Sequence, residues 1–340
     1  MTTQAAGPKA PGFPFEQLFE AEDAATGAAL PEPFADVYGP WTLPADEPYV
    51  YSNFIVSRDG RVSFNQPGAY LPDQLPVGID NDRWLMALLR GRADACVLGD
   101  ASLLIAPEVG FTVGSTEPAL AEPLAELRRQ EGLRPEMLPV ILSASGRVRP
   151  DADVWRRPGS KAVIATTRRG ARAAIEFASS GSPAGPAPDS VPEPGLSDPP
   201  ARPTRRGAQS PATPPAGPAR DASAQAGRTD IAVEVFDADW VDPNELVARL
   251  HAKYGARRII CEGGPTVYAR FLAAGAIHEE FFTLSPLVIG AAPNAHRPTV
   301  VEGVAFQPEA APVSQLISVR KAGDLLFLRS RYKPIQGGAS

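Results

Sequence analysis

The sequence predicts an α/β fold in which a mainly parallel β-sheet is covered by helices on both faces. Short apolar runs that are rich in β-branched residues alternate with helical segments along most of the chain. These runs are continuously apolar, which is typical of parallel strands buried on both faces. The last two runs are joined only by Lys321-Ala322-Gly323-Asp324, so they predict a C-terminal antiparallel hairpin.

Four strands are expected before the proline-rich part of the chain. The first lies at residues 49–57 and stops at Arg58-Asp59-Gly60, a turn signal that predicts a loop. The other three lie at residues 94–98, 138–143 and 161–166. Each of them is short and apolar, and each ends in glycine or in small polar residues, as buried strands do.

A helix is expected at residues 80–92, between the first two strands. Asp80 and Asn81 are residue types that cap helix N-termini. The apolar side chains that follow recur at helical spacing and therefore share one face that can pack on the sheet. They are Trp84, Leu85, Leu88 and Leu89.

The second half of the chain continues the alternation. Strands are expected at residues 231–236, 258–261 and 278–284, and helices at residues 242–253 and 265–274. Pro243 is tolerated in the first turn of its helix, and Gly255 ends that helix. The hairpin strands are expected at residues 315–320 and 325–332.

Proline, alanine, serine and glycine dominate residues 179–227, which contain almost no large apolar side chain. Such a segment cannot offset its ordering entropy, so we expect a disordered insertion. The flanks, residues 49–178 and 228–333, are expected to be two parts of one domain. Residues 1–48 predict an irregular N-terminal arm, and residues 334–340 a flexible tail.

Net charge, missing motifs and the placement of cysteine and histidine argue against several classes of function. A formal net charge of -6 repels nucleic acid on average. No secretory signal and no membrane-spanning run is recognised, so a cytoplasmic protein is expected. Cys96 and Cys261 lie in apolar runs, as small buried thiols do in reducing compartments. The three histidines lack metal-ligand spacing, so no metal site is expected.

The most informative local feature is Glu262-Gly263-Gly264-Pro265-Thr266, which follows a predicted buried strand and opens a helix. Glycines let backbone N–H groups approach a phosphate at the positive end of the helix dipole. Two glycines alone also fit a tight strand-to-helix turn that binds nothing. The neighbouring motifs therefore have to decide between these two interpretations.

Those motifs resemble dihydrofolate-reductase-like enzymes, and in particular the RibD C-terminal family, the reductase domain that follows the deaminase in bacterial riboflavin biosynthesis. The resemblance runs from residue 49 to residue 332 without the insertion. Its four anchors stand in the family's order: Ser57-Arg58-Asp59-Gly60, Asp94-Ala95-Cys96-Val97-Leu98-Gly99, the glycine turn, and Pro286-Leu287-Val288-Ile289-Gly290. It implies a three-layer α/β/α sandwich, NADPH as the cofactor and a homodimer.

The resemblance also implies a role for each motif. Substrate binding falls to Asn53, Ser57 and Asp59, although Asp59 before glycine also fits a plain turn. Glu262 is the candidate proton donor after hydride transfer, with water as the alternative. The implied NADPH-binding residues are Gly99, Ser102, Ser143, Ser145, Arg147, Thr166, Gly263, Gly264, Pro265 and Thr266.

The function implied is NADPH-dependent reduction of 5-amino-6-(5-phosphoribosylamino)uracil or a similar small molecule. Two departures from the family's usual motifs allow a different substrate, which could be a pterin, an imine or a carbonyl compound. Asn53 replaces the lysine that is usual in the family, and residues 103–107 replace an Asp-Asn-Pro-type segment. The zinc-ligand pattern of the deaminase is also absent. A third hypothesis is a nucleotide-binding protein without turnover, for which the insertion would serve as a tether.

Overall fold

The structure is a computed structural model, and it describes residues 8–22, 27–44, 48–66, 69, 74, 78–108, 110–157, 159–180 and 229–333. Its strands are β1 (Glu16–Glu20), β2 (Ala28–Ala29), β3 (Thr42–Leu43), β4 (Tyr49–Val56), β5 (Ala95–Gly99), β6 (Leu138–Leu142), β7 (Lys161–Thr167), β8 (Asp230–Phe236), β9 (Arg258–Cys261), β10 (Glu279–Leu284), β11 (Ser314–Ala322) and β12 (Leu325–Tyr332). The helices are α1 (Glu32–Tyr38), α2 (Ile79–Gly91), α3 (Asp100–Ile105), α4 (Ala121–Gln130), α5 (Ala171–Ser180), α6 (Pro243–Tyr254) and α7 (Pro265–Ala273), with 3₁₀ turns at Pro118–Leu120, Asp153–Trp155 and Pro308–Ala310.

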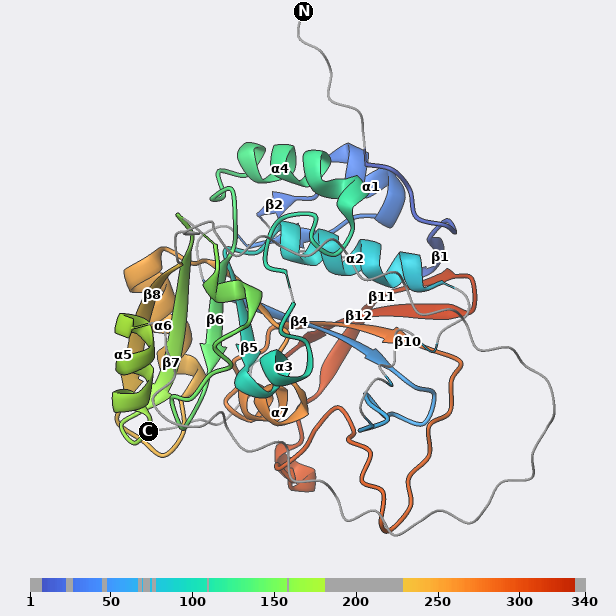
Figure 1. The fold of residues 1–340 in the computed structure, drawn as a ribbon. Helices are drawn as coiled ribbons and strands as arrows, with labels where there is room; N and C mark the ends of the chain where they lie inside the picture. The colour runs from blue at the N-terminus through green and yellow to red at the C-terminus, as the bar shows by residue number, and fades with distance from the viewer. Residues whose placement is uncertain are drawn as a thin grey trace, which may run out of the picture.

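Within the described residues, ten strands form one large sheet in the order β1-β11-β12-β10-β4-β9-β5-β6-β7-β8 (Figure 1). Neighbouring strands from β10 to β8 pair in parallel. Strands β12, β11 and β1 extend the sheet antiparallel. The predicted α/β class, with its mainly parallel sheet and C-terminal hairpin, is confirmed.

The two flanks of the proline-rich segment meet in this sheet. Strand β7 precedes the segment and β8 follows it, and the two pair in parallel from Lys161 with Asp230 to Thr167 with Phe236. Most of the predicted insertion, its residues 181–227, lies outside the described residues, as does the predicted tail at 334–340. The described parts on either side therefore share one sheet.

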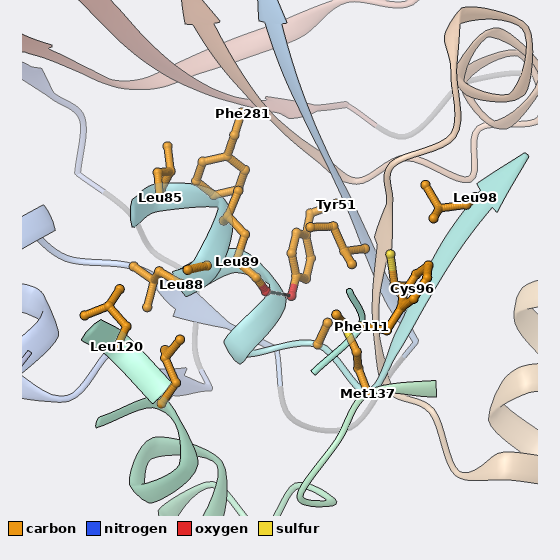
Figure 2. Close-up of a cluster of buried hydrophobic side chains, with 14 of the residues drawn as sticks. Tyr51, Leu85, Leu88, Leu89, Cys96, Leu98, Phe111, Leu120, Met137 and Phe281 are labelled. Atoms are coloured by element: carbon orange, nitrogen blue, oxygen red, sulfur yellow. Dashed lines mark hydrogen bonds between the residues drawn. The ribbon is translucent and has the colours of Figure 1, made fainter. Parts of the chain in front are cut away.

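Two apolar cores lie on opposite faces of the sheet. Helices α6 and α7 bury their side chains in one core, whereas α1, α2, α4 and α5 contribute to the other. Figure 2 shows part of the second core, where the Tyr51 hydroxyl donates a hydrogen bond of 2.8 Å to the Leu89 carbonyl oxygen. This contact holds α2 against β4, so that α2 packs on this face of the sheet.

The N-terminal segment differs from the irregular arm that was predicted. Its described residues include β1, which pairs with β11 and covers that strand's edge. They also include α1, which buries Phe34 and Tyr38 in the core beside α2. Scattered aromatic residues gave no periodic signal, because these elements are short and are stabilised by tertiary contacts.

Helix α2 also begins differently from the prediction. It starts at Ile79 after Gly78, whose φ of 86° places it in the left-handed region. Asp80 and Asn81 thus lie in the first turn and do not cap the helix. Asn81 instead donates a hydrogen bond of 2.8 Å to the Phe13 carbonyl oxygen, which ties α2 to the N-terminal segment.

Helices α3, α4 and α5 were not predicted. Among the described residues, no helix combines the length and apolar character that crossing a bilayer requires.

We expect Leu88→Ala to lower the free energy of unfolding by about 2–5 kcal/mol, because truncation leaves a cavity under α2. Leu88 is completely buried in the core of Figure 2. Urea denaturation measures the change. Ile175→Ala is the control, since Ile175 is 51% exposed and its truncation should cost far less. Equal losses in the two variants would contradict this packing.

Candidate functional site

The carboxyl ends of the parallel strands bring the predicted motifs to one edge of the sheet. Strand β9 lies between β4 and β5, so the glycine turn that follows β9 is central. The loop after β4 lies on one side of it, and the ends of β5 and β6 lie on the other. Ligands of open parallel sheets bind at this edge. The four predicted motifs are therefore brought together by the strand order.

The two glycines of the central turn have different roles. A Cβ atom on Gly263 would lie 2.3 Å from Val267 Cγ1, so the packing of α7 on the turn requires glycine there. A Cβ atom on Gly264 would meet nothing within 4 Å, and its φ of -60° suits any residue. Gly264 therefore borders open space at the N-terminus of α7, the end of a helix at which anions bind. Pro265 and Thr266 form the first turn of α7.

The predicted substrate residues Ser57 and Asp59 connect two loops. The Asp59 carboxylate accepts hydrogen bonds from the backbone N–H groups of Ile289 (3.0 Å) and Gly290 (2.7 Å), and Ser57 Oγ donates to it at 2.7 Å. The N–H of Ile289, followed by the Ser57 hydroxyl, lowers the pKa of Asp59 to about 2. Asp59 is therefore ionised, and it holds the loop of the first motif against the loop of the fourth.

Glu262 forms an ion pair with Arg90 of α2. Arg90 Nε donates to both carboxylate oxygens, at 2.9 and 3.0 Å, and Nη2 donates at 2.6 Å. The two side chains are only 8% and 13% exposed. Burial lowers the pKa of Arg90, but the adjacent carboxylate outweighs burial and raises it overall. The predicted role of Glu262 as proton donor does not fit this arrangement, because a proton on either oxygen would break a contact with Arg90.

Three further polar side chains lie near this pair, one on α2 and two on strands β4 and β10. Asp82 is 5% exposed, and its Oδ1 atom has no hydrogen-bond partner in the described part of the chain. The same holds for Thr283 Oγ1 and for Oδ1 of Asn53, the predicted substrate residue. Burial raises the pKa of Asp82 to about 6, against the opposing effect of the nearby Thr283 hydroxyl.

Sequence reasoning missed Asp82 and Arg90. The sequence holds no signal that pairs Arg90 with Glu262, because the two are 172 residues apart and meet only in the fold. The free cysteines fit their prediction, as both are buried. Cys96 Sγ lies 3.6 Å from Glu262 Oε2, and burial raises the pKa of this thiol, so it is not a nucleophile.

The loop after β6 holds the residues predicted to bind the adenosine 2′-phosphate. Ser143 Oγ donates to the Arg147 carbonyl oxygen at 2.8 Å, and the Arg147 N–H donates to Ser145 Oγ at 3.3 Å. The Arg147 side chain is exposed and makes no hydrogen bond or ion pair with a described residue. It is therefore available to a phosphate group.

The remaining predicted cofactor residues differ in how accessible they are to a ligand. Gly99 directly precedes α3, and Ser102 is half-buried within that helix. Thr166 does not fit a cofactor contact, because it is completely buried in β7 beneath Gly170. Asp100 was not predicted, and it lies near Ser143. Burial raises the pKa of Asp100, and the nearby Ser143 hydroxyl opposes this effect.

Comparisons with known proteins agree with this geometry. Residues 219–324 match the model of the RibD C-terminal domain family. The chain is 24% identical over 259 residues to an Archaeoglobus fulgidus protein named 2,5-diamino-6-ribosylamino-4(3H)-pyrimidinone 5′-phosphate reductase, covering 76% of this chain and 88% of that protein. The resemblance that the sequence motifs predicted is thereby confirmed.

Solved structures share the fold. A pyrimidine reductase-like protein from Corynebacterium diphtheriae superposes with a TM-score of 0.56 at 16% identity, covering 88% of this chain and 98% of that one. Acinetobacter baumannii RibD superposes with a TM-score of 0.53, also at 16% identity, over 84% of this chain. The match spans 58% of the length of that RibD chain. The dihydrofolate-reductase-like architecture is thus confirmed.

We expect Asp82→Asn to gain stability relative to the wild type as the pH rises from about 4 to about 8. The pKa of Asp82 is higher in the folded than in the unfolded protein, so the folded protein holds the extra proton and loses stability as the pH passes from about 4 to about 6. The gain is at most about 3 kcal/mol. Urea denaturation at the two pH values measures it.

The control for this variant is Asp80→Asn, in the exposed first turn of the same helix. It should show no comparable gain. An Asp82→Asn variant whose stability relative to the wild type is the same at both pH values would contradict the burial of an ionisable carboxyl at this position.

Proposed function

We propose that this chain is an NADPH-dependent reductase of a ribosylaminopyrimidine 5′-phosphate in riboflavin biosynthesis. The observation that carries the proposal is the Gly264 turn, which opens onto free space at the centre of the sheet edge where the four family motifs converge. The name of the A. fulgidus relative supports the same reaction class. Open space at Gly264 favours a bound diphosphate over the alternative of a turn packed against protein.

The residues along the edge suit the parts of NADPH in order. The backbone around Gly264 and Thr266 would hold the diphosphate, and Arg147 with Ser145 would hold the 2′-phosphate beyond β5. NADPH, when bound, supplies a hydride for C1′ of the ring-opened imine of the substrate, whose nitrogen takes up one proton. The Glu262–Arg90 pair would line the wall beside the reacting carbon and keep α2 in place. A water molecule is the proton donor that this arrangement favours.

The proposal includes a homodimer that works in the cytoplasm. The family resemblance supports the dimer, and the two buried free thiols suit a reducing compartment. Sedimentation of the full chain tests the dimer.

A reductase of a different substrate is the second candidate. It is favoured by Asn53, which stands in the site where the family usually has lysine, and by the 103–107 segment, where α3 ends. Oxidation of NADPH by a carbonyl or pterin acceptor, but not by a ribosylaminopyrimidine phosphate, would identify it. Saturable NADPH binding with no oxidation by any acceptor would instead identify the non-catalytic alternative.

We expect Gly264→Ala to weaken NADPH binding by about tenfold or more while leaving the melting temperature close to that of the wild type. The added methyl group has room in the protein, so it can interfere only with a ligand. Isothermal titration calorimetry and thermal unfolding measure the two effects. Gly263→Ala is the contrast, because its methyl group would collide with Val267 and should destabilise the fold. Unchanged affinity in Gly264→Ala would contradict the proposed diphosphate site.

We expect Arg147→Ala to weaken NADPH binding by about tenfold and NADH binding hardly at all, because a guanidinium contact to the 2′-phosphate is worth roughly 1.5–3 kcal/mol. Fluorescence titration of both nucleotides gives the ratio. Arg168→Ala serves as the control, since Arg168 is already paired with Asp237. A parallel loss for both nucleotides would argue against 2′-phosphate recognition by Arg147.

A further inference from the structure

A pocket lies at the amino ends of β6 and β7, at the opposite edge of the sheet from the glycine turn. Its walls are the residues that lead into these two strands and the last residues of α6. Its volume is about 750 Å³. Pockets that hold small molecules usually measure roughly 300–1,000 Å³. A ligand of nucleotide size therefore fits here, away from the place proposed for NADPH.

Basic side chains dominate the lining of this basic pocket. Five of its residues are basic, and they come from three separate segments of the chain: Arg134, Arg156, Arg157, Lys161 and Lys253. One lining residue, Glu136, is acidic. Two further carboxylates lie beside the lining, Asp230 next to Lys161 and Glu234 next to Lys253. Even when these three acidic residues are counted, two positive charges remain.

Three of the basic side chains hold the walls of the pocket together. Arg157 forms an ion pair with Glu136, which joins the residues before β7 to those before β6. Arg134 donates a hydrogen bond to the Tyr254 carbonyl oxygen at the end of α6. Lys253 Nζ donates to Glu234 Oε2 at 2.6 Å. The walls are thus fixed by contacts with one another and do not depend on a ligand.

The other two basic side chains, Arg156 and Lys161, are available to a ligand. The Arg156 side chain is exposed and forms no hydrogen bond or ion pair within the described part of the chain. Its charge acts at longer range on Asp151, which already pairs with Arg149. Lys161 Nζ lies 3.9 Å from Asp230, and both side chains are mostly exposed, so this pair contributes little. An anion can engage both cations without breaking a buried contact.

The remaining lining residues are suited to an apolar ring. Met137, Leu138 and Pro139 are buried and present apolar surface. Tyr254 is half-buried, and its hydroxyl donates to Glu234 Oε1 at 3.0 Å, which fixes the side chain. A ligand that combines phosphate groups with a flat ring matches both parts of this lining.

We propose that the basic pocket is a second nucleotide site, which binds a nucleoside diphosphate or triphosphate with Arg156 and Lys161 on its phosphate groups. Hydrogen bonds from these cations to phosphate oxygens are charge-assisted and strong. The carboxyl end of α6 by itself disfavours an anion. Here the Tyr254 carbonyl oxygen is engaged by Arg134, and Lys253 adds a positive charge in the last turn.

The test is calorimetric titration of ADP into the full chain saturated with NADPH, so that ADP cannot occupy the site proposed at the glycine turn. We expect one ADP to bind per chain and adenosine, which lacks phosphate groups, to give no heat. The double variant Arg156→Ala/Lys161→Ala should weaken ADP binding by about tenfold or more, because it removes two charge-assisted contacts.

Two controls accompany this titration. Arg172→Ala changes an exposed arginine of α5 outside the pocket and should leave ADP binding unchanged. The double variant should keep the melting temperature and the NADPH affinity of the wild type, since both of its side chains are exposed and far from the glycine turn. Absence of ADP binding, equal ADP affinity in the double variant, or adenosine binding as tight as that of ADP would each overturn the inference.

Failure of this inference is distinct from failure of the proposed function. If NADPH itself gives no binding heat, the proposed function fails, and ADP is titrated into the free chain instead. Weaker ADP binding in Arg156→Ala/Lys161→Ala than in Arg172→Ala then still supports the second site, and equal or absent binding overturns it.

Discussion

The ion pair between Arg90 and Glu262 is the contact on which the arrangement of the site depends. It joins α2 to the end of β9 through three hydrogen bonds between two side chains that are largely buried. Removing one partner of such a pair leaves an uncompensated buried charge, which typically costs about 3–5 kcal/mol. The pair thereby ties α2 to the start of the glycine turn, at which the diphosphate site is proposed.

Along the carboxyl ends of the strands, backbone groups and side chains would contribute differently to ligand binding. The glycine turn offers backbone N–H groups that suit any dinucleotide, so discrimination has to come from its surroundings. On one side, the exposed Arg147 suits a phosphate. On the other, Asp82 and Asn53 provide buried acceptors. Asp59 links the loop after β4 to the loop after β10 by accepting hydrogen bonds from the N–H groups of Ile289 and Gly290. In the proposed function, selectivity would therefore come from the side chains on either side of the glycine turn.

The sequence predicted the elements whose signal is local and missed those that depend on tertiary contacts. Continuous apolar runs located β4 to β10, and Asp242 and Gly255 marked both ends of α6. Strand β1 and helix α1 were missed because their stability comes from pairing with β11 and packing beside α2. The glycine turn was found from its motif, whereas Asp82 was passed over, since its buried position emerges only when α2 is laid on the sheet. Glu262 was found, but its partner Arg90 could not be read from one sequence.

Hydrogen exchange followed by mass spectrometry, with and without NADPH, tests the central claim most directly. The account predicts slower exchange at the backbone amides of residues 263, 264 and 266–268 when NADPH is bound, with a smaller effect at residues 143–147. The basic pocket, in contrast, lies at the amino ends of β6 and β7, lined by Arg134, Arg157 and Lys161 among others. Protection confined to that pocket, with unchanged exchange at the glycine turn, would contradict the account.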